Sequence, residues 1–181
     1  MNSLIQLPVD STEKRGLSLI ITQDQARQSK RDLIATLILK GPLFVVSGDE
    51  WLPAFELPRI IRGQTTAVKE VMNRLYTARA SSCYRLFDSL ASLPSKGEPI
   101  LVMEFLHTFY DVDIPLRTRL FRLRECCREL SRLAAHRPVI VITRAGEGED
   151  YDKFLPAVCP IANQILTLAP ELEPLQQPAL F

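Results

Sequence analysis

The chain alternates short apolar runs with longer stretches in which apolar residues recur at helical spacing. The short runs are rich in valine, isoleucine and leucine, which is typical of strands buried on both faces of a sheet. One further segment, 74–79, is less apolar but has the same length. The predicted strands are Leu17–Thr22, Pro42–Ser47, Arg74–Arg79, Ile100–Glu104, Pro138–Thr143 and Gln164–Leu168.

Helical segments are predicted between these strands. The first has apolar residues at positions 33, 34, 37 and 38 and stops at Gly41-Pro42, a pair that ends helices. Three others cover residues 65–73, 81–93 and 116–136, of which the last is the longest. Segments 52–62, 107–115 and 145–150 are predicted to be irregular, because prolines, glycines or clustered polar residues interrupt them.

Strands that alternate with helices predict a mostly parallel sheet with helices on both faces. We therefore expect an α/β fold with three layers, α/β/α, in one domain that covers residues 17–169. We expect residues 1–16 to form a loose lead-in and residues 170–181, with three prolines, to form a flexible tail. Sites in such sheets lie beyond the carboxyl ends of the strands. Residues 22–31, Asp49, Glu104 and Arg144 are thus expected to gather at one edge.

Composition narrows the class of protein. Apolar residues make up 46% and charged residues 24% of the 181 residues, and the formal net charge is only +1. Such a chain has no global field that attracts nucleic acid or lipid. No apolar run approaches the roughly 18 residues of a membrane span, and the first residues do not resemble a secretory signal. We expect a cytoplasmic protein with no membrane partner.

Cysteines and histidines do not predict a metal site. The four cysteines contain no CxxC pair, and the two histidines are isolated from each other. Cys126 and Cys127 are neighbours in a predicted helix, where their side chains diverge. We expect all four cysteines to be small apolar residues in a reducing compartment.

The first predicted strand, loop and helix have the layout of a phosphate-binding loop of a nucleoside triphosphatase. The residues of that loop are mostly different. Lys30 has the place of the phosphate-binding lysine, whereas Asp24 and Ser29 stand where glycines are needed for close backbone approach to phosphate. Arg31 stands where a hydroxyl would hold magnesium. We interpret this segment as resembling a Walker A loop with degenerate residues.

Several segments in order resemble the core of the RecA-type recombinases and their paralogues. The most specific is 75–90, LYTARASSCYRLFDSL, with its Ala78-Arg79-Ala80 turn. The strand that ends at Glu104, the loop Phe109–Asp113 and the strand 138–143 follow in the family's order. The resemblance covers about 17–168. It implies a RecA-like, P-loop NTPase fold and a role in recombination or DNA repair.

Within this resemblance, Glu104 replaces the aspartate at the end of the magnesium-binding strand, and Asp49 lies near the water-activating glutamate. Arg144 lies in the region of the polar sensor after the fifth strand. Lys30, Arg31 and Ser29 are the candidate anion-binding residues at a helix N-terminus. Catalysis by Asp49 and Glu104 would need a bound nucleotide; alternatively these carboxylates are solvated or paired with Lys30 or Arg144.

Three functions are compatible with these features. The leading one is a non-catalytic RecA-like paralogue, a pseudo-ATPase that binds a protein partner or DNA as a platform and needs no cofactor. The second is a divergent but active DNA-dependent ATPase, with ATP and magnesium bound at Lys30. The third is a purely structural subunit of a complex. We also expect association with a protein partner or with a second copy of the chain.

Arginines recur on one side of the longest predicted helix. The four residues Arg117, Arg124, Arg128 and Arg132 fall within a sector of roughly 80° on a helical wheel. Such a row contacts a phosphate backbone or an acidic partner. Alternatively, it is a solvated face on which Glu125 and Glu129 pair with neighbouring arginines. Arg144 is a fifth candidate contact for DNA or a partner.

Overall fold

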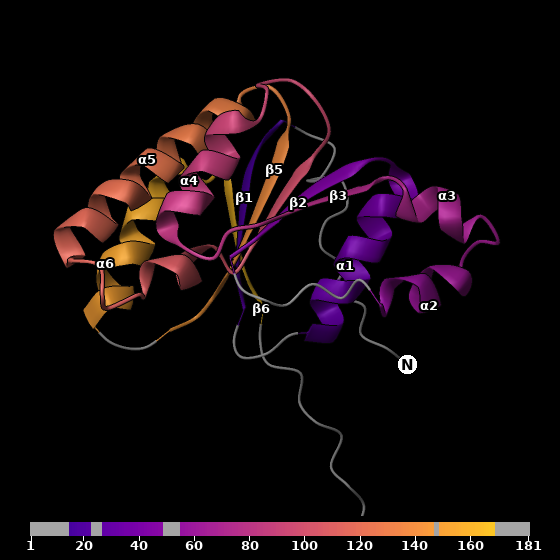
Figure 1. Cartoon of the computed structure of the whole chain (residues 1–181), viewed down its shortest axis with the longest axis horizontal. Helices are drawn as coiled ribbons and strands as arrows, with labels where there is room; N and C mark the ends of the chain where they lie inside the picture. Colours follow the sequence, from indigo (N-terminus) through magenta and orange to yellow (C-terminus); the bar gives the residue numbers. More distant parts are fainter. Residues whose placement is uncertain (1–14, 23–26, 49–54, 147–148, 169–181) are drawn as a thin grey trace, which may run out of the picture.

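The computed structural model describes residues 15–22, 27–48, 55–146 and 149–168. Within these ranges the chain forms a six-stranded sheet in the order β3-β2-β4-β5-β1-β6. All five neighbouring strand pairs are parallel. Helices cover both faces of this sheet, so the predicted three-layer α/β arrangement is confirmed (Figure 1).

The strands lie where the hydrophobic pattern predicts them, to within one or two residues at either end. Their order along the chain alternates with helices, as a parallel sheet requires, because each crossover must return the chain to the same end. The strands are β1 Gly16–Thr22, β2 Leu43–Ser47, β3 Leu75–Arg79, β4 Ile100–Met103, β5 Pro138–Arg144 and β6 Gln164–Leu168.

The helices include the four predicted segments and others. The six α-helices of the described ranges are α1 Arg27–Lys40, α2 Leu57–Arg62, α3 Val68–Met72, α4 Cys83–Ser92, α5 Leu116–Ala134 and α6 Glu149–Val158. Short 3₁₀ helices cover Phe105–Phe109 and Cys159–Ile161. Three of these elements were predicted to be irregular, wholly or in part: α2, the start of α6 and the 3₁₀ turn Phe105–Phe109.

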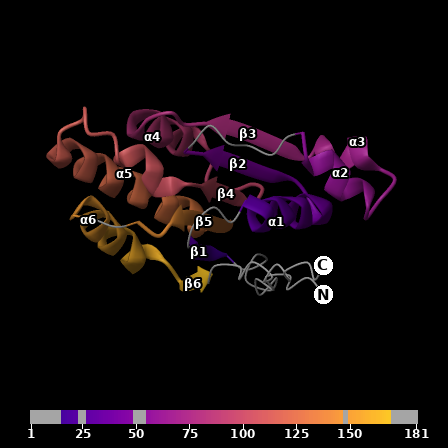
Figure 2. The ribbon, with the colours of Figure 1, turned by 90° about the horizontal axis from the view of Figure 1, so that it is seen from below.

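The two faces of the sheet bury different sets of side chains. On one face α4, α5 and α6 pack against residues such as Val102 and Val141; on the other, α1, α2 and α3 pack against residues such as Val45 and Ile140. Figure 2 shows the two helical layers on opposite sides of the strands. Alternate residues of a strand point to opposite faces, so the near-continuous apolar runs fill both layers.

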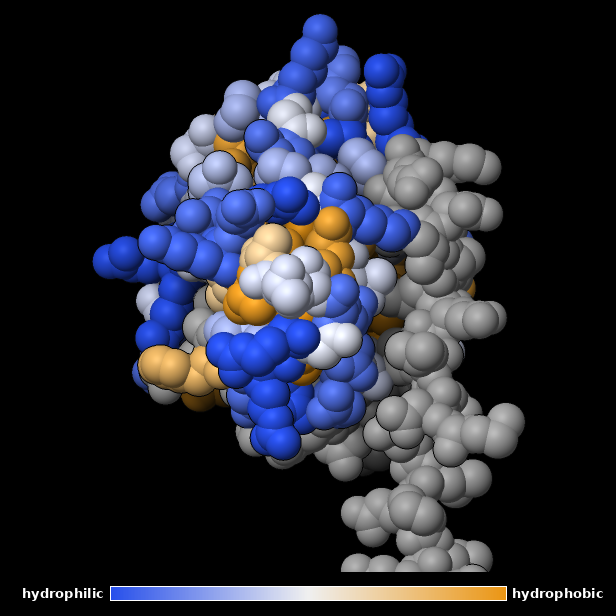
Figure 3. Space-filling view, turned by 90° about the vertical axis from the view of Figure 1, so that its right-hand side faces the viewer, coloured by the Kyte–Doolittle hydropathy of each residue, from blue (hydrophilic) through white to orange (hydrophobic). Residues whose placement is uncertain are grey.

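The outer side of α2 and α3 is mainly hydrophilic, with a small apolar area among hydrophilic side chains (Figure 3). No helix of the described residues is both long and apolar enough to cross a membrane.

A close backbone contact joins β2 to the end of β4. The Gly48 N–H donates to the Met103 carbonyl at 2.8 Å. A Cβ atom at Gly48 would lie 2.5 Å from the Glu104 carbonyl oxygen, so a side chain has no space there. Glu104 itself has a φ of 51°, in the left-handed region that few residues other than glycine adopt. The chain thus turns sharply where β4 ends.

Candidate functional site at the carboxyl edge of the sheet

Glu104 is the central residue of this edge. It follows β4 directly and leads into the 3₁₀ turn Phe105–Phe109. Although it is charged, only 3% of its surface is exposed. A carboxylate buried to this degree is stable only when cations or donors compensate its lost hydration. The left-handed backbone at Glu104 changes the direction of the chain at this point. The carboxylate forms ion pairs with residues of α1 and β5.

Lys30 is the first of these partners. It lies in the first turns of α1, is 5% exposed, and its Nζ donates to the Glu104 Oε1 in a direct ion pair. Arg144, the last residue of β5, is the second partner, and its Nη2 lies 3.4 Å from the Glu104 Oε2. Lys30, Glu104 and Arg144 together are called the edge triad below.

The strand order explains why these three residues meet. β5 lies between β1 and β4, so Arg144 at its end is next to the end of β4. α1 follows β1 and starts on the same edge. The sequence predicts these residues at one edge and leaves a pairing of Glu104 with Lys30 or Arg144 as an alternative. The structure shows that pairing with both.

The predicted anion-binding set Lys30, Arg31 and Ser29 is not brought together as one cradle. Arg31 donates from Nη2 to the Gln28 side chain at 2.6 Å, and its Nη1 pairs with Glu56, the residue before α2. Arg31 thus ties α1 to α2. Ser29 is half-buried in the first turn of α1. Asp49 and the loop 23–26 that contains Asp24 lie outside the described residues.

The edge triad fits a nucleoside triphosphate and its magnesium ion poorly. In a phosphate-binding loop the lysine ammonium is the charge that meets the phosphates. Here that ammonium is already paired with a buried carboxylate of the same chain. The carboxylate at the end of β4, which the resemblance assigns to magnesium, is likewise occupied by two cations. The described residues contain no group of three or more metal-ligating side chains.

An open pocket of about 390 Å³ lies where β2 and β3 end, and no residue of the edge triad lines it. Its lining includes Arg79 from the end of β3, His107 from the 3₁₀ turn, and Asp111 just after it. Tyr110 also lines it, and burial raises the pKa of its phenol to about 12, so this hydroxyl stays protonated at neutral pH. Sequence reasoning did not single out this set, because its members come from three separate segments.

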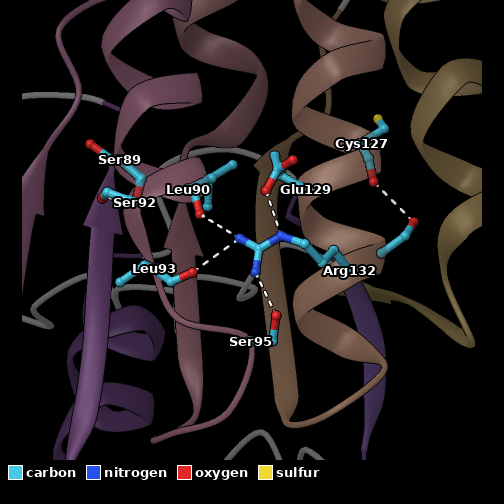
Figure 4. A network of polar contacts seen from close by, with 9 residues as sticks. Ser89, Leu90, Ser92, Leu93, Ser95, Cys127, Glu129 and Arg132 are labelled. Carbon is cyan, nitrogen blue, oxygen red and sulfur yellow. Dashed lines mark hydrogen bonds and ion pairs between the residues drawn. The ribbon is translucent and has the colours of Figure 1, made fainter.

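The four arginines predicted to form a row on α5 divide into two groups. Arg117, Arg124 and Arg128 are exposed, whereas Arg132 is bound to its neighbours. Arg132 donates to Glu129 at 2.7 Å, to Ser95 at 2.8 Å, and to the carbonyls of Leu90 and Leu93 at 3.2 and 3.0 Å. Figure 4 shows its guanidinium between α5 and the end of α4. Arg132 therefore contributes to internal packing rather than to an open contact surface.

Arg119 is a buried arginine that sequence reasoning missed. It is 6% exposed, and its Nη1 donates to the Phe109 carbonyl at 3.0 Å and to Asp150 at 2.6 Å. Its guanidinium also lies 5.6 Å from the centre of the Phe154 ring. The signal was its position four residues before Leu123, on the apolar stripe of α5. Arg119 joins the 3₁₀ turn, α5 and α6.

Comparison with known proteins assigns no family to the chain. No protein-family model matches the sequence, and no curated protein matches it.

Proposed function

We propose that this chain is a non-catalytic paralogue of the RecA-type recombinase core that binds a protein partner or DNA as a platform in recombination or repair, with no or weak binding of ATP. The family part of this proposal rests on the ordered segments of the sequence, above all 75–90. The resemblance implies a parallel sheet between two layers of helices, which is the arrangement observed.

The ion pair of Lys30 and Glu104 is the observation that supports the non-catalytic part of this proposal. Phosphate oxygens would have to displace a carboxylate that is attached to the same fold and is already buried. Glu104 would then keep only Arg144, 3.4 Å from its second oxygen, to compensate a nearly fully buried charge. Arg31, which stands where a magnesium-binding hydroxyl is needed, is bound to Glu56 and Gln28 instead.

Calorimetric titration with magnesium and ATP tests this proposal. We expect no saturable binding in the micromolar range, with wild-type chain and with Lys30→Met as the matched control. Weak heats that are equal in the two proteins would come from a site other than Lys30 and agree with the proposal. Micromolar affinity that disappears in Lys30→Met would overturn it.

An active ATPase is the competing function, since Lys30 and Glu104 are both present at the predicted edge. It requires the ammonium of Lys30 to exchange Glu104 for phosphate during each turnover. A phosphate-release assay in the presence of DNA distinguishes the two functions. Activity that is lost in Lys30→Ala would establish the ATPase, whereas no release above the buffer rate agrees with the non-catalytic platform.

A further inference from the structure

The outward side of α5 carries three arginines around one phenylalanine. Arg117, Phe121, Arg124 and Arg128 are all exposed, and Phe121 exposes 54% of its surface. These four residues are called the α5 ridge. Phe121 lies four residues after Arg117 and three before Arg124, so the ring stands among the guanidinium groups on one face of the helix.

No carboxylate in the described part of the chain pairs with the arginines of the ridge. The two glutamates of α5 are used elsewhere, because Glu125 accepts from Arg122 at 2.6 Å and Glu129 accepts from Arg132 at 2.7 Å. Both of these pairs lie on the side of α5 that faces α4. The ridge therefore carries three positive charges that no carboxylate of the described ranges compensates.

An aromatic cluster lies next to the ridge. The Arg122 guanidinium lies 4.9 Å from the centre of the Tyr84 ring, and 5.6 and 5.8 Å from those of Phe87 and Phe121. Tyr84 is still 40% exposed. Because Arg122 already occupies faces of these rings, they do not form an open row on which successive bases would stack. Tyr84 and Phe121 nevertheless keep exposed surface that is available for apolar contact.

We propose that the α5 ridge binds an acidic, amphipathic helical segment of a protein partner. The proposal rests on the proposed platform function and names the class of its partner. Carboxylates of the segment would pair with Arg117, Arg124 and Arg128, and an apolar side chain would pack on Phe121 and the edge of Tyr84.

Residue type and spacing both favour this partner. α5 contains six arginines and no lysine, and arginine binds carboxylates in a two-pronged geometry that lysine lacks. Arginine and aromatic residues are enriched in protein interfaces, where lysine is depleted. Arg117 and Arg124 are about 10 Å apart along the helix axis, and Arg124 and Arg128 about 6 Å. A second helix alongside α5 repeats its side chains at the same intervals.

Fluorescence anisotropy with the full chain at low salt tests this inference. The probe is a labelled helical peptide of about 20 residues, with glutamates at the intervals of Arg117, Arg124 and Arg128 and a leucine at the interval of Phe121. We expect saturable binding that weakens by about tenfold or more in Arg124→Gln/Arg128→Gln. Phe121→Ala should weaken binding of this peptide but not of a version with alanine in place of leucine.

The matched control removes the same charge from the other helical layer. Arg59→Gln/Arg62→Gln on α2 should change binding by no more than about twofold. Equal losses in the two double variants would overturn the inference, as would no binding of the peptide to the wild-type chain. An oligothymidylate that binds more tightly than the peptide and loses affinity in Arg124→Gln/Arg128→Gln would overturn it in favour of nucleic acid.

The same protein samples are titrated with magnesium and ATP. Peptide binding at the α5 ridge together with micromolar ATP affinity would contradict the non-catalytic function and leave the ridge as a docking site. Absence of both ATP and peptide binding would leave the non-catalytic function in place and overturn only the docking inference.

Discussion

When the chain folds, Lys30 and Glu104 both lose hydrating water and form an ion pair with each other. Both side chains are nearly fully buried, and Arg144 approaches the second oxygen of Glu104 from a more exposed position. A buried pair of this kind gains little net stability, since desolvation of two charges offsets most of their attraction. Removal of one member is nonetheless expensive, because the other charge remains buried.

Substitution of either member should destabilise the chain more than substitution of both. Glu104→Leu leaves Lys30 unpaired and is expected to cost about 3–5 kcal/mol in free energy of unfolding. Lys30→Met should cost less, because Arg144 still compensates Glu104. The double variant Lys30→Met/Glu104→Leu should recover most of the loss. Urea unfolding of the four proteins measures the cycle; strictly additive losses would show that the two charges are not coupled.

The buried cysteines make a pH-dependent contribution to the free energy of unfolding. Burial raises the pKa of the Cys126 thiol above its ordinary value of 9.0 and that of Cys127 to about 12. A thiol whose pKa is higher in the folded than in the unfolded chain contributes stability that is complete below the unfolded pKa and is lost as pH rises. We therefore expect the free energy of unfolding to fall between pH 9 and about 12.

Urea unfolding at a series of alkaline pH values measures this decrease. Cys126→Ala/Cys127→Ala should show a shallower decrease than the wild-type chain. The remaining slope would come from other buried acids, including Tyr110, whose pKa burial raises in the same direction. An unchanged slope in the double variant would contradict the assignment to these thiols.

At the scale of elements, hydrogen bonds of Arg132 join α4 and α5 in addition to apolar packing. Arg132 donates to the carbonyls of Leu90 and Leu93 at the end of α4, where the last carbonyls of a helix lose their usual intrahelical donors. The Leu90 carbonyl also accepts from the Leu93 N–H at 3.3 Å. Arg132 also holds Ser95 in the following loop. An arginine in the last turns of one helix thus stabilises the carboxyl end of its neighbour.

Arg132→Gln should lower the free energy of unfolding by about 1–3 kcal/mol, because several hydrogen bonds to a charged group are lost. Arg128→Gln, one turn before Arg132 in the same helix, is the matched control. It should change the free energy by no more than about 0.5 kcal/mol, as is usual for an exposed side chain without a partner. Thermal and urea unfolding measure both, and equal effects would contradict the role given to Arg132.

Two elements show where local patterns were insufficient. α6 contains Pro156, and its first two residues, Glu149 and Asp150, lie in the segment predicted to be irregular. Phe154 and Val158, four residues apart, are nevertheless both fully buried in the cluster that also holds Leu123. Acidic residues in its first turn also favour the positive end of a helix. In α2, Pro58 occupies an early helical position, where its missing N–H costs little.

The whole molecule has two apolar layers on one shared sheet. Phe154 lies in the layer of α4, α5 and α6, and Ile38 lies in the layer of α1, α2 and α3. Because β1, β2, β4 and β5 each contribute buried side chains to both layers, loss of either layer should unfold the sheet.

Phe154→Ala and Ile38→Ala should therefore each shift a single unfolding transition. The expected losses are about 3–5 and 2–5 kcal/mol, respectively, because each leaves a cavity in a fully buried site. Circular dichroism and hydrogen exchange should report the same midpoint for both layers. Two separate transitions, with only one shifted by each variant, would show that the layers unfold independently.

The sequence by itself determined the six strands, their parallel arrangement, and the edge at which Lys30, Glu104 and Arg144 meet. These follow from local patterns, because β-branched apolar runs, helical spacing and the alternation of the two act within a few residues of each other. The positions of α1, α4 and α5 followed in the same way.

Only the tertiary structure decided which charges meet. Lys30 and Glu104 are 74 positions apart, and Arg132 binds carbonyls about 40 positions away. A helical wheel placed Arg132 with Arg117, Arg124 and Arg128, but the packing of α4 took its guanidinium inward. Ion pairs depend on distance and burial in space, which strand order and helix packing set and which local spacing does not contain.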